Sequence, residues 1–482
     1  MDTEADTARD WWRDAVVYQV YPRSFQDTDG DGTGDLPGIT RRLDHIDRLG
    51  VDALWLSPIY PSPGADLGYD VTDHAAVDPA FGTIDDFDRL LEAAHARGLR
   101  VLMDLVPSHT SIEHPWFRAH PERYIWSDDG PANNWRAAFG GPAWSRDPES
   151  GRWYLHSFFP EQPDLDWRNP DVAEAIGAVM RFWLARGVDG FRVDAVDRLI
   201  KDERLRDDPP ATRPFPLYLR PEVAELELRY SGDRPDVGTA LTALRHAAGD
   251  ALLVGEAYVP TARLGAYLEH LDLTFCFELL HAAWNADRLG EVIGAAVESG
   301  GCAWILSNHD FPRLASRVGT EGARGAALLL LTLPGPAFLF QGDELGMPNG
   351  AEPAAPIDRA GRDPFRTPMP WDSGPGAGFT TGLPWLPLIG DEVGSVADQE
   401  ADEGSTLALY RRLIRLRREL GRGFQLLDAP EGVLAYERGD HLIAMNVSGE
   451  RTALPWRGDV VLATGPEPDP LETGAGVVLT TA

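Results

Sequence analysis

Four short polar segments carry the residues of this sequence that are best suited to acid–base chemistry, and each ends or follows an apolar run. The segments are Asp104–His109, Gly190–Asp194, Gly255–Glu256 and Asn308–Asp310. If the apolar runs are parallel strands of one barrel, their carboxyl ends meet at a single mouth, where such barrels hold their active sites. Three carboxylates, two histidines and an arginine would then face one another.

The spacing of these residues predicts two carboxyls in different protonation states. Side chains two residues apart share one face of a strand, so Arg192 is expected to lower the pKa of Asp194 and keep it ionised. Glu256 follows an apolar run without a basic neighbour in sequence, which favours its protonated form. Retaining glycoside hydrolysis needs this pair, with Asp194 as nucleophile and Glu256 as acid. Asp310 would stabilise the positive charge that develops on the sugar.

Apolar β-branched runs alternate with helical patterns over most of the chain. The predicted strands cover 15–21, 53–59, 100–106, 190–196, 252–257, 273–279, 304–307 and 337–341, and the predicted helices include 84–96, 172–186 and 324–332. This alternation predicts parallel βαβ units, and eight of them close a (β/α)8 barrel of the α/β class. An open, doubly wound sheet is the alternative architecture.

Two segments interrupt the alternation and predict additional domains. Residues 110–168 follow the third strand, are rich in Trp, Pro and Asn, and show little periodicity, which indicates a small insertion domain. Residues 421–482 follow a predicted helix at 407–420 and contain short alternating segments, which indicates a C-terminal antiparallel β domain. The barrel would then consist of 1–109 and 169–420.

Charge and composition narrow the classes of partner. The chain has 482 residues and a formal net charge of −32. Nucleic acids and anionic membranes bind clusters of Lys and Arg, so the negative charge argues against both as partners and suits a small neutral ligand.

Residues 1–10 lack the apolar segment of a secretion signal, and no apolar run is long enough to span a membrane, so we expect a cytoplasmic protein. Two cysteines are too few for a disulfide framework, no organic cofactor is expected, and the oligomeric state stays open.

A loop after the first predicted strand has the spacing of a cation-binding loop. Four carboxylates within nine residues would repel one another without a cation. The expected ligands are the carboxylates of Asp27, Asp29, Asp31 and Asp35 and the backbone carbonyl of Thr33. Gly38 stands where an EF-hand has its bidentate Glu, so the loop is only EF-hand-like. We expect a structural Ca²⁺ or Mg²⁺ here, and the alternative is a polar turn without a metal.

The four polar segments resemble the four signature regions of the α-amylase superfamily, glycoside hydrolase family 13. The resemblance runs along nearly the whole chain, and several further segments are similar to the α-glucosidase and oligo-1,6-glucosidase branch. These further segments are Tyr18–Phe25, Gln162–Trp167, Gln341–Met347 and Arg366–Asp372. Each motif alone is unspecific, but the combination is very specific to this family.

The resemblance implies a role for each candidate residue. Asp194 would be the nucleophile, Glu256 the general acid/base and Asp310 the transition-state stabiliser. Tyr69 would stack on the terminal glucose and Asp70 would bind its hydroxyl groups. The resemblance further implies that Arg366 pairs with Asp70 and closes the far end of the pocket. The remaining sugar-binding or supporting residues would be His109, Arg192, His309 and Asp104, and the family also places a Ca²⁺ or Mg²⁺ at the loop described above.

The implied activity is that of a retaining, exo-acting α-glucosidase that releases glucose from the non-reducing end of short α-glucosides. In this branch the residue after the nucleophile tends to be Val in α-1,6-acting enzymes and Ala, Gly or Thr in α-1,4-acting ones. Ala195 therefore favours α-1,4 substrates such as maltose. Ser108 replaces the Asn that helps to bind calcium in many α-amylases, which argues against that calcium site. A transglycosylase or isomerase acting on sucrose, maltose or trehalose would use the same covalent intermediate and stays open as the alternative.

Overall fold

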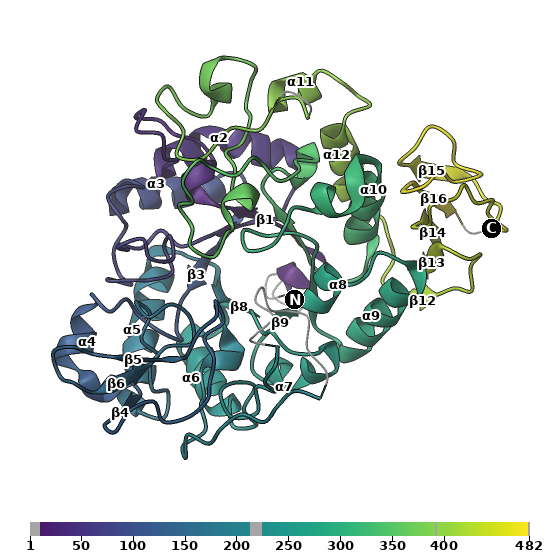
Figure 1. The fold of residues 1–482 in the computed structure, drawn as a ribbon. Helices are drawn as coiled ribbons and strands as arrows, with labels where there is room; N and C mark the ends of the chain where they lie inside the picture. Colours follow the sequence, from purple (N-terminus) through teal and green to yellow (C-terminus); the bar gives the residue numbers. More distant parts are fainter. Residues whose placement is uncertain (1–9, 213–223, 391–392, 481–482) are drawn as a thin grey trace, which may run out of the picture.

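The central unit of the fold is a closed parallel barrel. The structure is a computed structural model that describes residues 10–212, 224–390 and 393–480. The prediction that the chain has no secretion signal rests on residues 1–10, which lie outside the described residues except for Asp10. The barrel strands follow one another in the order β1-β11-β10-β9-β8-β7-β3-β2 (Figure 1). They are β1 (Val16–Val20), β2 (Ala53–Leu56), β3 (Arg100–Leu105), β7 (Gly190–Val193), β8 (Leu252–Gly255), β9 (Leu273–Phe275), β10 (Cys302–Ile305) and β11 (Ala337–Phe340).

The predicted α/β barrel is confirmed, and the open sheet is wrong because β1 pairs with both β2 and β11. The strands end earlier than predicted, since the chain turns outward at their carboxyl ends to present polar residues. The largest difference falls on 273–279, where the strand stops at Phe275 and the helix α8 (Phe277–His281) follows. An apolar run of this length does not by itself distinguish a buried strand from a short buried helix.

Helices surround the barrel, as Figure 1 shows. They are α2 (Leu36–Leu49), α3 (Ile84–His95), α5 (Pro170–Arg186), α6 (Gly238–Ala248), α7 (Gly265–Leu268), α8, α9 (Ala286–Ser299), α10 (Leu314–Thr332), α11 (Val396–Glu400) and α12 (Thr406–Arg417). The sequence explains their ends. Thr83 and Asp86 form a capping box at the start of α3, and α5 runs from the Asn169 cap to Gly187 in the left-handed region. Within the described residues, every helix is too short or too polar to cross a membrane.

Two further sheets lie outside the barrel. The first has the order β4-β6-β5 and is built from β4 (Trp126–Ser127), β5 (Trp144–Arg146) and β6 (Trp153–Leu155), next to α4 (Pro115–Ala119). The second is antiparallel and comprises β12 (Phe424–Leu426), β13 (Val433–Arg438), β14 (His441–Asn446), β15 (Val460–Ala463) and β16 (Gly476–Thr480). It packs on α9 and α10, on the side of the barrel away from the first sheet (Figure 1). The C-terminal sheet is confirmed, whereas the exact domain boundaries stay a prediction.

Candidate active site

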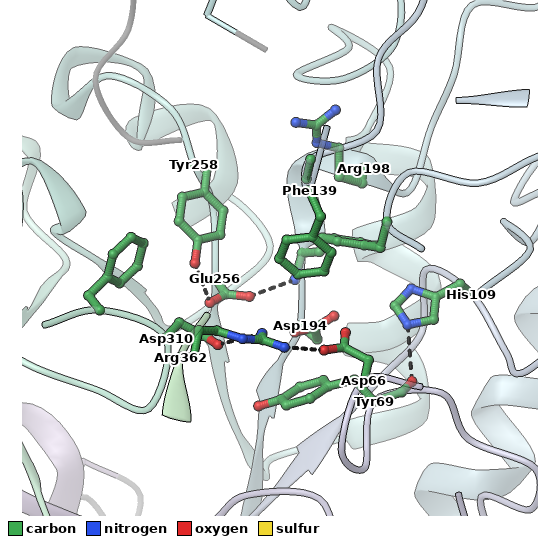
Figure 2. A pocket seen from close by; sticks show the side chains of 14 residues that line it. Asp66, Tyr69, His109, Phe139, Asp194, Arg198, Glu256, Tyr258, Asp310 and Arg362 are labelled. Carbon is green, nitrogen blue, oxygen red and sulfur yellow. Dashed lines mark hydrogen bonds and ion pairs between the residues drawn. The ribbon is translucent and has the colours of Figure 1, made fainter. Parts of the chain in front are cut away.

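The carboxyl ends of β7, β8 and β10 bring Asp194, Glu256 and Asp310 into one pocket (Figure 2). Asp194 and Glu256 extend the barrel ladder by one residue. The amide of Asp194 donates to the Leu105 carbonyl, and the amide of Glu256 donates to the Val193 carbonyl, both at 2.9 Å. Strand pairing therefore fixes both carboxyls at the same height above the barrel.

Arg192 is the central charge of the site. It lies directly opposite Asp104 in the β3–β7 ladder and is buried. Its Nη1 is 2.6 Å from an oxygen of Asp104 and 2.8 Å from one of Asp194, while its Nη2 is 2.5 Å from Glu256. One guanidinium cannot balance three buried carboxylates, so the cluster retains a proton near neutral pH.

The pKa of Asp194 is shifted in the direction opposite to the one predicted from the sequence. Burial raises the pKa of Asp194 well above its ordinary value, and Arg192 only partly opposes this effect. Burial likewise raises the pKa of Asp104 to about 6. Arg192 lowers the pKa of Asp194, as predicted, but burial and the carboxylates of Glu256 and Asp104 raise it more. The predicted net lowering is therefore wrong, because Asp194 shares the guanidinium with two other carboxyls.

The surroundings of Asp310 lower its pKa, whereas those of Asp194 raise it. Its carboxylate lies 2.9 Å from Nη1 of Arg362, 3.1 Å from Nη2 of Arg366 and 3.3 Å from Nε2 of His309. Burial alone would raise the pKa of Asp310, but these neighbours outweigh it and hold the pKa below the ordinary range. Asp310 is thus an ionised carboxylate, which suits contact with positive charge.

Arg362 and Asp66 form an ion pair that is part of the pocket lining (Figure 2). Arg362 is nearly fully buried and also pairs with Asp358 at 2.7 Å. Sequence reasoning assigned this role to Asp70 and Arg366 and missed both members of the actual pair. Arg366 instead donates to the His309 carbonyl at 2.8 Å and pairs with Asp310 at 3.1 Å.

The backbone turn between Asp66 and Asp70 explains why the sequence pointed to the wrong aspartate. Asp70 points back into its own loop, where it accepts hydrogen bonds from Ser62 Oγ at 2.6 Å and from the amides of Ala65 and Asp66 at 2.8 and 3.0 Å. Leu67, between them, adopts a left-handed conformation with φ 47°, so the chain reverses direction and leaves Asp66 facing the pocket. Both aspartates flank the same Tyr69, and spacing alone does not select between them.

The other predicted binding and supporting residues contact one another around Tyr69. Tyr69 and His109 line the pocket, and His109 Nε2 donates to the Tyr69 carbonyl at 3.1 Å. The ring of His309 stacks on Tyr69 with centroids 5.4 Å apart, and the Tyr69 hydroxyl donates to Asp104 at 3.0 Å. Burial lowers the pKa of His109 to about 4, so it stays neutral and its ring acts as a hydrogen-bonding group.

The pocket has an aromatic wall that sequence reasoning missed. The additional lining residues include Phe139, Phe158, Tyr258 and Phe311. The first two come from the insertion segment, where no periodicity indicated their position, and Phe139 lies above the carboxylates in Figure 2. Their approach to the barrel depends on tertiary packing rather than on a local motif.

Comparison with known proteins agrees with this geometry. The family model for the alpha amylase catalytic domain matches residues 19–422. A probable α-glucosidase of Rhizobium meliloti (strain 1021) is 41% identical over 465 residues, covering 85% of this chain and 83% of the relative. A glucan 1,6-α-glucosidase of Streptococcus pneumoniae serotype 4 is 35% identical over 93% of this chain and 94% of its own.

Solved structures agree as well. The α-glucosyl transfer enzyme XgtA superposes with a TM-score of 0.91 and 36% identity, covering 98% of this chain and 99% of that one. The isomaltulose synthase PalI of Klebsiella sp. LX3 gives 0.89 and 30%, with coverages of 98% and 99%. The predicted resemblance is confirmed: this chain is a glycoside hydrolase that belongs to the α-amylase family, glycoside hydrolase family 13, in its α-glucosidase branch.

Proposed function

We propose that the protein is a retaining, exo-acting α-glucosidase that releases glucose from the non-reducing end of short α-1,4-glucosides such as maltose. The observation that carries this proposal is the Arg362–Asp66 ion pair in the pocket lining, which we infer blocks the pocket at one end. A closed pocket accepts the end of a glucoside, whereas the interior of a polymer needs a groove open at both ends. The α-glucosidases among its relatives support the same activity.

The proposed reaction has two steps at one anomeric carbon. In the reactive form, the proton that the carboxyl cluster retains sits on Glu256 and leaves Asp194 ionised. Asp194 attacks the anomeric carbon while Glu256 gives its proton to the glycosidic oxygen, so the carbon–oxygen bond breaks and the leaving group departs as an alcohol. Glu256 then takes a proton from water, which displaces Asp194 and gives glucose with its α configuration retained. The ionised Asp310 faces the positive charge that develops on the ring.

The size of Ala195 supports α-1,4 linkage. Ala195 lines the pocket directly after Asp194, and its backbone is left-handed with φ 45° and ψ 48°. A methyl group leaves room beside the scissile bond for an aglycone joined through a ring hydroxyl.

A second candidate is transfer of glucose to another sugar. The aromatic wall favours it, because Phe139, Phe158, Tyr258 and Phe311 would hold an acceptor and exclude water. Similarity to an α-glucosyl transfer enzyme and to an isomaltulose synthase supports transfer as well.

The products formed from four substrates distinguish hydrolysis from transfer. The protein is incubated separately with maltose, isomaltose, sucrose and trehalose, and the products are followed by NMR. Free glucose released fastest from maltose supports hydrolysis; new sugars without matching glucose support transfer; no turnover contradicts both.

The closing pair gives the next prediction. Asp66→Asn should lower kcat/KM for maltose about 10–100-fold, mainly through KM, because it removes a charged hydrogen-bonding group from the pocket. Asp70→Asn is the matched control, since its carboxylate bonds within its own loop, and should change kcat/KM less than about threefold. A larger loss in Asp70→Asn than in Asp66→Asn would contradict the assignment.

We further propose that the loop 27–35 holds a structural Ca²⁺ or Mg²⁺. Among the described residues, Asp27, Asp29 and Asp35 each offer a carboxylate oxygen, all within 4.8 Å of one another, which fits a hard cation. Asp31 instead accepts from the Thr33 amide at 2.6 Å, so Asp31 and Thr33 are the less supported members of the predicted set. Asp27 also accepts from the Thr380 hydroxyl and links this loop to a distant segment.

Removing the cation should therefore destabilise the fold. Chelation with EDTA is expected to lower the melting temperature by about 5 °C, and added Ca²⁺ or Mg²⁺ should restore it, because a ligand bound only by the folded state stabilises that state. Asp29→Asn should melt at the lower temperature with or without EDTA. Equal melting curves for the untreated and chelated wild type, with no metal found by elemental analysis, would refute the site.

A further inference from the structure

We propose that Tyr258 is a positioning residue that determines which oxygen of Glu256 carries the proton for the leaving group; this inference rests on the proposed function. Tyr258 follows β8 two residues after Glu256 and lines the pocket. Its hydroxyl points at the carboxyl of Glu256 in Figure 2 and donates to Oε1 at 3.0 Å.

The surroundings of Glu256 differ between its two oxygens. Oε1 lies 2.5 Å from Nη2 of Arg192 and accepts from the Tyr258 hydroxyl. Oε2 accepts a longer bond, 3.2 Å, from the amide of Ala195. A carboxylate oxygen has two acceptor positions, so both positions of Oε1 face donors, and a proton there would meet the guanidinium. The proton therefore belongs on Oε2.

Tyr258 is held in place independently of Glu256. Its ring stacks on Phe277 with centroids 4.7 Å apart and an interplanar angle of 3°, and its amide donates to Asp197 Oδ1 at 3.2 Å. Burial raises the pKa of Tyr258 well above its ordinary value, so the phenol keeps its proton and acts as a donor. The aromatic stack thus aims the hydroxyl, and the hydroxyl orients the carboxyl.

This contact matters most when Glu256 becomes negatively charged. As the proton on Oε2 passes to the glycosidic oxygen, the bond from that oxygen to the anomeric carbon breaks and the bond to Asp194 forms. Glu256 is left as a carboxylate, and hydrogen bonds to an ionised acceptor are stronger than bonds to a neutral one. Tyr258 therefore assists the step in proportion to how much the leaving group needs the proton.

The test compares leaving groups in Tyr258→Phe, which keeps the ring and removes the hydroxyl. With maltose, whose sugar alcohol leaves only when protonated, kcat/KM should fall about tenfold. With p-nitrophenyl α-glucoside, whose leaving group departs with little protonation, kcat/KM should fall less than about twofold. For both substrates kcat/KM reports the steps up to formation of the glucosyl-enzyme, so the comparison isolates proton donation.

Phe277→Leu is the control variant, because it weakens the stack and keeps the hydroxyl. Because that stack aims the hydroxyl, the loss in Phe277→Leu should also be larger on maltose than on p-nitrophenyl α-glucoside, and smaller than the loss in Tyr258→Phe. Equal losses on both substrates in Tyr258→Phe, or no loss on either, would overturn the role of the hydroxyl. A wild-type protein that hydrolyses neither substrate would overturn the proposed function itself and this inference with it.

Discussion

Asp194→Ala is expected to abolish turnover of maltose while the protein stays folded. The variant removes the atom that forms the covalent bond to the sugar, so kcat should fall about 10⁴-fold or more. Folding should survive because Arg192 keeps its contacts with Asp104 at 2.6 Å and with Glu256 at 2.5 Å. Glucose release measures the first effect, and thermal melting followed by circular dichroism measures the second.

Asp166→Asn provides the matched control for this variant. It also removes one carboxylate, but that carboxylate accepts from the Arg168 amide at 3.0 Å and does not line the pocket. Its activity should stay within about twofold of wild type. Near-normal turnover by a folded Asp194→Ala variant would reject Asp194 as the nucleophile.

Glu256→Gln has the second largest expected effect. The amide keeps the shape of the carboxyl, and its oxygen can accept from Arg192 and Tyr258 in the place of Oε1, but it cannot transfer the proton that the leaving sugar needs. We expect kcat/KM for maltose to fall about 10²–10⁴-fold. With α-glucosyl fluoride, whose leaving group needs little protonation, the first step should survive, and the glucosyl-enzyme should accumulate because no base activates water.

Rapid-quench kinetics and intact-mass spectrometry test this variant. A burst of fluoride release together with a mass gain of one glucosyl group would agree with Glu256 as acid and base. Equal losses on maltose and on the fluoride would contradict that assignment, since a residue that only shapes the pocket affects both substrates alike.

The barrel and the position of the catalytic carboxylates could be predicted from local features. Each barrel strand is a short buried apolar run, and parallel strands must place their carboxyl ends together, so Asp194, Glu256 and Asp310 converge once the runs are recognised. The same reasoning places Arg192 beside Asp104, because the β3–β7 register pairs the two residues.

The wrong or missing predictions concern features that depend on residues distant in the sequence. The choice between Asp66 and Asp70 depends on the left-handed turn at Leu67, a position where the residue type gives no warning. The pKa of Asp194 depends on how three carboxyls share one guanidinium, and neighbours in sequence reveal only one of those contacts. Phe139 and Phe158 reach the pocket only because the insertion segment folds over the barrel.

The anomeric form of the glucose first released from p-nitrophenyl α-glucoside, whose leaving group is not a sugar, tests the central claim most directly. Proton NMR during the first turnovers distinguishes α- from β-glucose before mutarotation mixes them. A nucleophilic Asp194 with Glu256 as acid and base requires two inversions and therefore predicts α-glucose first. β-Glucose as the first product would mean a single displacement by water and would contradict the covalent role of Asp194.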